Sequence, residues 1–300
     1  MIKKRILILL FFIFIFNKNS YCEQKIESEK VITPPVIDGI ANDEAWNNAK
    51  EITTYDKIAK LDVVIKSVYT DKEVFFIVTY PDLDKSISHK SWVWLKGLDV
   101  YKLGPDREDI FIFKWNMIGD TTLDLSLSAD EPYFADVWFW KASRTDPVGF
   151  ADDKYDRLSA TELPESMKTI SKKGYVRYLQ RPGDDGAASY TNLWYSEFAG
   201  EKLPHFSTRA PKGSRADVKA KGIWENNKWT IEFARALNTN NKDDAQFDIS
   251  KSYQFGVSRY EISARSAELE SEQPFYNLGD ISEDIFLVFK PEPEKEKGNE

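Results

Sequence analysis

The 300-residue sequence predicts an all-β protein: an antiparallel two-sheet β-sandwich with long loops at one end and few short helices. Two observations predict this fold. Apolar runs at 61–69 and 74–80, and again at 216–224 and 229–235, are each joined by a short polar turn, as in β-hairpins. No amphipathic helical pattern longer than about three turns occurs. Hydrophobic residues make up 42% of the chain and aromatic residues 14%, enough for a substantial core.

The N-terminal residues 1–22 are predicted to be a signal peptide and not part of the fold. Lys3, Lys4 and Arg5 precede an unbroken apolar run at 6–16 that is too short to span a bilayer. We therefore expect a periplasmic or otherwise exported protein that is not transmembrane after signal cleavage. Cys22 is the only cysteine, so no disulfide can form within the chain, and lipid attachment at Cys22 is the less favoured alternative.

The remaining residues, 23–290, are expected to form a single domain, followed by a disordered charged tail at 291–300. In chain order, the first expected elements are a short strand at 36–39, one or two helical turns at 43–49 with Trp46 pointing inward, and the hairpin 61–69 and 74–80. A polar aromatic loop at 86–104, a strand at 110–115 and a strand beginning at 133 follow. The rest is an irregular segment at 158–211, the second hairpin, and strands at 253–260 and 284–289.

The stretch 133–156 is the most informative part of the sequence. Ala135, Val137 and Phe139 alternate with Asp136, Trp138 and Trp140, which predicts a strand. Charged residues then gather around Pro147 and Gly149, which predicts a loop: Lys141, Arg144, Asp146, Asp152, Asp153 and Lys154. One interpretation is an aromatic pocket wall with a polar rim. The other is a core strand followed by a surface loop. Oxygen ligation of Ca²⁺ by Asp146, Asp152 and Asp153 is less favoured than a solvated acidic loop.

Several segments of the sequence carry a resemblance to a known family. They are Val36-Ile37-Asp38-Gly39, Arg107-Glu108-Asp109, Asp136-Val137-Trp138-Phe139-Trp140-Lys141-Ala142, 211–218 and Arg235-Ala236-Leu237. Together they resemble the ethylbenzene-dehydrogenase-related haem-binding domain, the gamma subunit of periplasmic molybdoenzymes of the dimethyl-sulfoxide-reductase class. The sandwich itself resembles family-9 carbohydrate-binding modules and DOMON-like domains.

That resemblance implies one haem b, an electron-transfer role, and a periplasmic molybdoenzyme or iron–sulfur subunit as partner. It also implies a methionine ligand upstream of the Trp-Lys-Ala strand and a lysine or histidine ligand near the last strands. This sequence departs from the pattern at both places. Residues 125–132 contain no Met, and residues 261–266 contain neither Lys nor His.

The candidate iron ligands in this chain are therefore Met117 and His89, with His205 as a further candidate cofactor contact. We expect them to close a pocket at one end of the sandwich, lined by Trp138, Trp140 and Lys141. Lys141 or Arg144 would meet the haem propionates. For the two histidines the alternative is a solvated loop, and for Met117 it is core packing.

Other functions are weighed against this one. The net charge is −8 and no basic stripe occurs, which argues against nucleic-acid binding. No GxSxG, HExxH or P-loop motif and no cysteine nucleophile indicates catalysis, so we expect a non-catalytic protein. The alternative function is a haem-free module that binds carbohydrate or another small ligand on exposed Trp and Tyr side chains.

Overall fold

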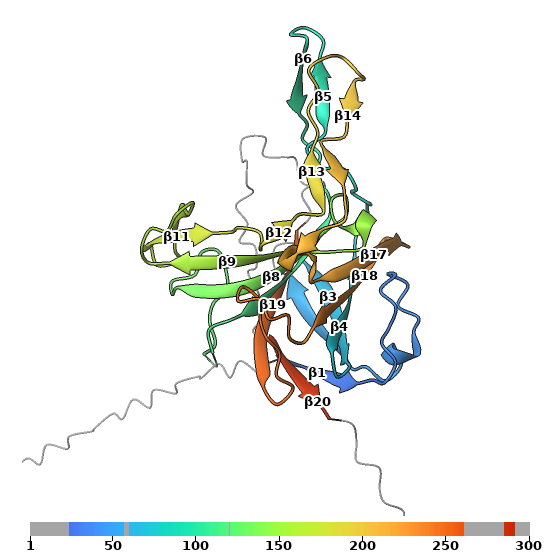
Figure 1. Cartoon of the computed structure of the whole chain (residues 1–300), viewed down its shortest axis with the longest axis vertical. Coiled ribbons are helices and arrows are strands. Elements are labelled where there is room, and N and C mark those ends of the chain that lie inside the picture. The colour runs from blue at the N-terminus through green and yellow to red at the C-terminus, as the bar shows by residue number, and fades with distance from the viewer. Residues whose placement is uncertain (1–23, 57–59, 120, 261–284, 292–300) are drawn as a thin grey trace, which may run out of the picture.

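The computed structural model describes residues 24–56, 60–119, 121–260 and 285–291, so the predicted signal peptide and the tail after 291 lie outside the described residues. The described chain is all-β (Figure 1). Its strands are β1 (Gln24–Lys30), β2 (Glu51–Asp56), β3 (Leu61–Tyr69), β4 (Glu73–Pro81), β5 (Trp92–Leu95), β6 (Val100–Leu103), β7 (Ile110–Asn116), β8 (Tyr133–Lys141), β9 (Asp152–Ser159), β10 (Met167–Ile170), β11 (Val176–Gln180), β12 (Gly186–Ala187), β13 (Tyr190–Asn192), β14 (Lys202–Leu203), β15 (Phe206–Thr208), β16 (Lys212–Gly213), β17 (Lys219–Glu225), β18 (Lys228–Ala236), β19 (Ser252–Tyr260) and β20 (Ile285–Lys290). Three single turns of 3-10 helix complete it: η1 (Glu44–Trp46), η2 (Asp146–Val148) and η3 (Ser214–Ala216). No helix among these residues has the length and apolar character needed to cross a membrane.

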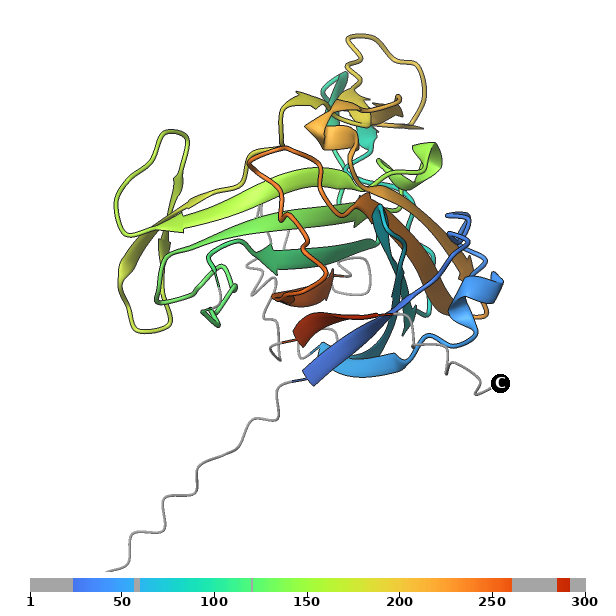
Figure 2. The same ribbon diagram turned by 60° about the horizontal axis from the view of Figure 1, so that its bottom comes forward.

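Thirteen of the described strands form one hydrogen-bonded ladder that folds over into two facing layers. The first layer has the order β10-β11-β9-β8-β7-β19-β20, and the second continues as β1-β3-β4-β18-β17, with β2 paired to β3. Figure 2 shows the green strands of the first layer lying across the teal and brown strands of the second. The two layers of the predicted sandwich are therefore joined by hydrogen bonds at one side, where β20 pairs with β1.

The core lies between the two layers and is mainly aromatic. The ring of Phe113 on β7 lies 5.0 Å from that of Phe76 on β4 and 5.1 Å from that of Phe233 on β18. The indole of Trp140 on β8 packs edge-on against Trp229 on β18, with centroids 4.9 Å apart. Because aromatic pairs add stabilisation beyond the area they bury, these contacts hold the layers in one arrangement.

Both predicted hairpins are confirmed, as β3–β4 and β17–β18. The sheet is mixed, however, because β1 pairs in parallel with both β20 and β3. A parallel partner cannot come from a hairpin, and β1 was not among the predicted strands. The N-terminal strand β1 completes the ladder by lying between β20 and β3.

The predicted strand at 36–39 is wrong, and the reason is a buried carboxylate. The backbone N–H groups of Asp38 and Gly39 donate to Glu232 Oε2 at 3.1 and 2.8 Å, and Trp46 Nε1 donates to its other oxygen at 3.0 Å. The segment therefore finds its partners on a side chain of β18 and not on a neighbouring strand. The helical turn predicted at 43–49 is present as η1, and Trp46 is buried as expected.

Two long excursions leave the sandwich at one end. The predicted loop 86–104 contains the β5–β6 hairpin, which β14 extends into a small three-stranded sheet projecting from the molecule (Figure 1). The irregular segment 158–211 contains the short strands β10 to β15. The segment 158–211 supplies most of the side chains that face β8 and β9 from outside.

Candidate functional site

Strand β8 sends its side chains alternately to the two faces of the first layer. Trp138 and Trp140 point into the core and are fully buried. Their indole N–H groups donate to Asp136 Oδ2 at 3.3 Å and to Asp146 Oδ1 at 3.0 Å. The expected placement of these two indoles in a pocket wall is therefore corrected. The same alternation turns Phe139 and Lys141 to the outer face.

The part of the chain predicted as a charged loop is largely strand β9. It pairs with β8 so that Asp152 lies opposite Phe139, and Lys154 lies opposite Val137. Asp152 and Lys154 therefore share the outer face with Lys141, while Asp153 points to the inner face. Asp146 turns elsewhere and accepts hydrogen bonds from Lys221 and the Gly222 backbone. The structure thus does not bring Asp146, Asp152 and Asp153 together.

Asp152 is the centre of a buried ion cluster on the outer face. It accepts from Lys141 Nζ at 2.5 Å and from Arg215 Nε at 3.0 Å, and the Tyr190 hydroxyl lies 3.3 Å from Lys141 Nζ. Burial opposes ionisation of this carboxyl, but the charges of Lys141 and Arg215 outweigh that effect and hold its pKa below the usual range. The cluster fixes the orientation of both cations.

A second buried cluster lies beside the first on the same face. Lys114 Nζ contacts Asp156 Oδ2 at 2.9 Å and the Tyr133 hydroxyl at 2.7 Å. Lys154 Nζ lies 3.4 Å from Asp156 Oδ1. Burial, reinforced by the charge of Arg181, lowers the pKa of Lys154 to about 7. Lys154 is consequently an amine with a substantial neutral fraction at physiological pH.

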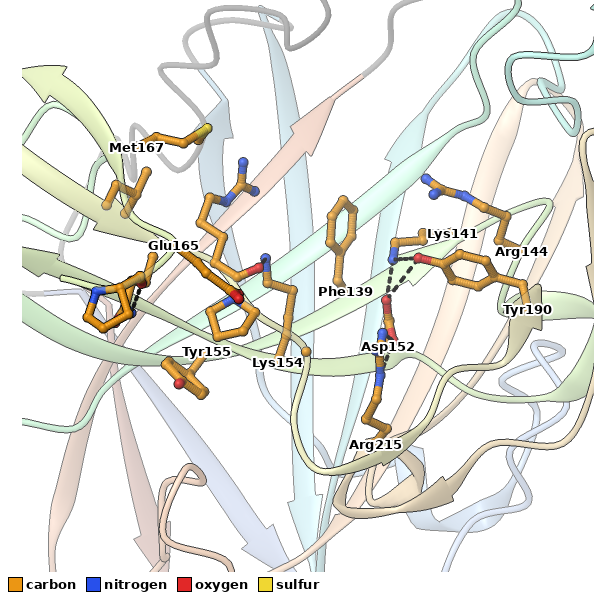
Figure 3. A pocket seen from close by; sticks show the side chains of 16 residues that line it. Phe139, Lys141, Arg144, Asp152, Lys154, Tyr155, Glu165, Met167, Tyr190 and Arg215 are labelled. Atoms are coloured by element: carbon orange, nitrogen blue, oxygen red, sulfur yellow. Dashed lines mark hydrogen bonds and ion pairs between the residues drawn. The ribbon is translucent and has the colours of Figure 1, made fainter. Parts of the chain in front are cut away.

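The first cluster and Lys154 of the second line a pocket of about 620 Å³ (Figure 3). Its lining residues are Phe139, Lys141, Arg144, Asp152, Lys154, Tyr155, Pro164, Glu165, Met167, Leu179, Gln180, Arg181, Pro182, Gly183, Tyr190 and Arg215. Figure 3 shows Lys141, Arg144, Tyr190 and Arg215 at one end and Met167 at the other, with Lys154 between them. Four cationic side chains and the partly neutral Lys154 face two carboxylates, so the pocket is suited to an anionic ligand.

The two histidines lie in a separate, smaller pocket of about 280 Å³ on the other side of Arg144. His89 Nδ1 lies 3.5 Å from Glu108 Oε1, and Arg144 also donates to Glu108. Burial and the charge of Arg144 lower the pKa of His89 well below its ordinary value. The ring of His205 stacks near that of Phe206, with centroids 4.1 Å apart.

Arg144 connects the two pockets, because its guanidinium lies 5.0 Å from the ring centroid of Tyr190 and 5.0 Å from that of Phe206. The structure therefore brings His89, His205, Arg144 and Lys141 into one neighbourhood.

Met117 does not join this neighbourhood. It follows the last residue of β7, whereas Lys141 lies opposite the first residue of β7, Ile110. With a rise of roughly 3.3 Å per residue, the two positions are about 20 Å apart. Met117 is half-buried and packs against the main core. The expected pocket containing both residues is corrected, because antiparallel pairing puts successive strand ends at opposite ends of the sheet.

Sequence reasoning missed Tyr190, Arg181 and Met167 as pocket residues, and it placed Lys154 in a loop, whereas Lys154 lies on β9. A signal for this strand was present. Asp152, Lys154 and Asp156 alternate with Asp153 and Tyr155, which is a period-2 pattern that reads as a strand once charge is allowed at buried positions. Pro147 and Gly149 indicated a longer loop than the one observed, which ends at Ala151, so the start of the strand was not recognised.

Comparison with known proteins gives one family and a group of solved structures. The family model described as "Ethylbenzene dehydrogenase" matches residues 41–267. A family-9 carbohydrate-binding module from Caldicellulosiruptor kristjanssonii in complex with glucose is 12% identical, with a TM-score of 0.43 over 91% of this chain and 98% of that one. A putative carbohydrate-binding protein from Bacteroides uniformis is 9% identical, with a TM-score of 0.39 over 90% and 100% of the two chains. No curated protein matches the sequence.

Proposed function

Because the chain belongs to the ethylbenzene dehydrogenase family, we propose that it is an exported b-type haem-binding protein that transfers electrons. In this proposal the pocket on the outer face of β8 and β9 holds the haem. A periplasmic molybdoenzyme or iron–sulfur subunit is the proposed redox partner. The bound haem would supply a one-electron redox centre.

The observation that carries the proposal is the division of the pocket into a cationic end and an apolar end. Lys141, Arg144 and Arg215 lie at the first end, and Met167 lies at the second, with Leu179 opposite it in the β10–β11 pair. A haem has the same division, with two carboxylates on one edge and apolar substituents opposite. The volume of about 620 Å³ falls inside the range of roughly 300–1,000 Å³ usual for ligand pockets, whereas the histidine pocket, at about 280 Å³, falls below it.

The pocket also offers side chains that can hold iron. An amine binds a metal only when it is neutral, and the lowered pKa of Lys154, about 7, meets that condition. The thioether of Met167 is a second donor in the pocket. We propose Lys154 and Met167 as the iron-holding side chains, in place of the expected Met117 and His89, which lie outside this pocket.

The side chains that would hold the propionates are already held in place by other contacts. Lys141 and Arg215 are oriented by Asp152, and Arg144 is oriented by Glu108 and by the rings of Tyr190 and Phe206. Side chains held in place lose little entropy on binding. Met167 is 43% exposed, so the opposite end of the pocket is open to an approaching redox partner.

Haem titration of matched variants tests the assignment. We expect Met167→Ala and Lys154→Ala each to shift the Soret band, and Met167→Ala to lower the reduction potential, because thioether ligation raises it. Arg215→Ala should weaken haem affinity at least tenfold. Met117→Ala is the control of the same chemistry and should leave the spectrum unchanged. A Soret shift in Met117→Ala, with none in Met167→Ala or Lys154→Ala, would overturn the assignment.

A second candidate function rests on the projecting sheet. Trp194 is 73% exposed and Phe198 is 57% exposed, and their rings lie 5.4 Å from Trp92 and 5.3 Å from Trp94. Such exposed aromatic faces suit stacking on a sugar ring. Oligosaccharide binding that Trp194→Ala abolishes, together with no haem uptake, would favour this haem-free function.

A further inference from the structure

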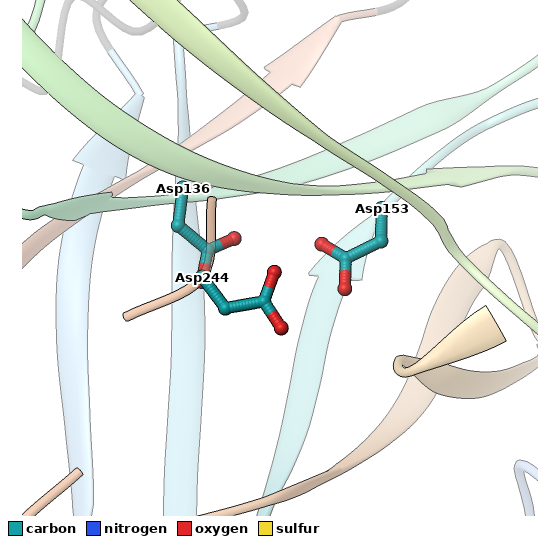
Figure 4. Close-up of side chains that lie close together, drawn as sticks. All are labelled: Asp136, Asp153 and Asp244. Atoms are coloured by element: carbon teal, nitrogen blue, oxygen red, sulfur yellow. The ribbon is translucent and has the colours of Figure 1, made fainter. Parts of the chain in front are cut away.

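Three carboxylates converge on the inner face of the first layer, on the opposite side of β9 from the pocket. Asp136 comes from β8, Asp153 from β9 and Asp244 from the connection between β18 and β19. Each offers an oxygen, and these oxygens all lie within 4.8 Å of one another. Figure 4 shows the three side chains pointing toward a common centre. All three are buried, with exposed fractions of 0%, 0% and 2%.

Most of the oxygens in this cluster lack a hydrogen-bond partner among the described residues. They are Asp136 Oδ1 and both oxygens of Asp153 and of Asp244. A fourth carboxylate, Asp184 on the loop between β11 and β12, is 5% exposed and also has two unpartnered oxygens. Its backbone N–H donates to the Asp153 carbonyl at 3.3 Å, which brings the loop to β9. Buried carboxylates are normally paired, protonated or bound to metal.

Arg235 is the cation that contacts this cluster, and its hydrogen bonds are largely committed. One of its terminal nitrogens donates to Asp136 Oδ2 and the other to the Ala245 carbonyl. Its guanidinium is held between aromatic rings, 5.0 Å from the centroid of Trp138 and 4.9 Å from that of Phe247. One guanidinium cannot neutralise four carboxylates, so the ionised cluster carries an excess of three negative charges.

The electrostatics of the cluster reflect that excess. Burial and the neighbouring carboxylates raise the pKa of Asp153 well above its usual value, that of Asp184 to about 9 and that of Asp244 to about 7. Asp243 and Asp217 lie near enough to raise these values further. Each of these carboxylates therefore opposes ionisation of the others, and a bound cation would relieve that repulsion.

We propose that Asp136, Asp153 and Asp244 bind one Ca²⁺ ion, with Asp184 adding negative charge from the neighbouring loop. The donor set contains only oxygen, which selects a hard cation over zinc, copper or iron. Ca²⁺ takes about six to eight oxygens at roughly 2.3–2.6 Å, so oxygens on opposite sides of the ion are about 5 Å apart, and the observed limit of 4.8 Å fits within that. Mg²⁺ usually keeps several waters, and a buried all-carboxylate cluster suits it less well.

This site is distinct from the proposed haem pocket, because adjacent residues of one strand serve the two faces. Asp153 points inward to the ion, whereas Asp152 and Lys154 point outward to the pocket. The ion would join β8 and β9 to the connection between β18 and β19. Its expected effect is a Ca²⁺-dependent rise in the melting temperature.

Terbium luminescence on the purified protein, stripped of metal with EDTA, tests the site. Tb³⁺ replaces Ca²⁺ in oxygen sites and emits when a nearby indole is excited. Trp138 lies beside the cluster, with its Nε1 3.3 Å from Asp136 Oδ2. We expect sensitised emission that saturates at one Tb³⁺ per chain and that Ca²⁺ displaces. Asp153→Asn and Asp244→Asn should each weaken Ca²⁺ binding at least tenfold. Asp99→Asn, which removes the same charge from an exposed turn, should not.

Calorimetry of the unmodified protein keeps the test decisive if those variants fail to fold. Ca²⁺ titrated at pH 7 should bind with a stoichiometry of one ion per chain and should displace bound Tb³⁺ together with its sensitised emission. Ca²⁺ heat that leaves the Tb³⁺ emission unchanged would place the ion on other carboxylates and overturn the proposal. So would the absence of any Ca²⁺ heat and any sensitised emission, or unchanged affinity in both cluster variants.

Discussion

Asp152→Asn is the substitution that most directly tests how the pocket floor is held. The carboxylate is 3% exposed and receives hydrogen bonds from Lys141 and Arg215. An asparagine of the same size has no charge, so two cations lose their anionic partner. Arg215 has a side chain that is 19% exposed and can turn to water, but that of Lys141 is 4% exposed and cannot.

The magnitude follows from that difference. Removing one partner of a buried ion pair costs about 3–5 kcal/mol. Because one of the two cations can be rehydrated, we expect a loss near the lower end, about 3 kcal/mol at pH 7. The control Asp99→Asn lies in an exposed turn and should stay within about 0.5 kcal/mol of the wild type.

The assay is urea unfolding, with the free energy of unfolding extrapolated to water and the m-value checked for constancy. The double variant Lys141→Met/Asp152→Asn should recover about 1–2 kcal/mol relative to Asp152→Asn, since the orphaned ammonium is gone. The pKa of Asp152 is held below its usual range in the folded protein. Its contribution is therefore present above about pH 4, and the gap to the variant should narrow as the pH falls below that value. A single variant as stable as the wild type would refute the reasoning.

Two further predictions concern buried groups. The pKa of Lys154 is lowered to about 7 on folding. Between about pH 7 and 10 the unfolded chain therefore binds more protons than the folded one, and the contribution of Lys154 to the free energy of unfolding rises with pH. Urea unfolding should show the wild type becoming more stable relative to Lys154→Met between pH 7 and pH 9, and a constant difference would contradict this. In Gly222→Ala the new Cβ would lie 2.7 Å from Cζ2 of the buried Trp140, so we expect the free energy of unfolding to fall by about 1–3 kcal/mol from overpacking. The control is Gly97→Ala, whose Cβ would have nothing within 4 Å. Equal melting temperatures for the two variants would argue against a tight contact at Gly222.

The fold was predictable because hairpins are local. β3–β4 and β17–β18 each lie within a short stretch of sequence, and alternation together with a polar turn identifies them. β1 was not predictable in this way, because its parallel partners β20 and β3 are remote in sequence. Glu232 shows the same limit, since nothing local indicates that a carboxylate on β18 would replace a strand partner for Asp38 and Gly39.

The candidate site was predictable in part. Lys141 and Arg144 line the large pocket, because the end of β8 lies beside the segment 158–211. Trp138 and Trp140 face the core instead, since alternation along a strand leaves their orientation open until the buried face is known. Met117 was grouped with Lys141 on the basis of strand ends alone, and the antiparallel register separates them.

The central claim is that the pocket over β8 and β9 holds haem b, and the absorption spectrum tests it most directly. Protein expressed with haem supplied, and then titrated with haemin, should show a Soret band and one haem b per chain by pyridine haemochrome assay. The band should shift on reduction with dithionite. Protein that is folded by circular dichroism, yet shows no Soret band after expression or titration, would contradict the account.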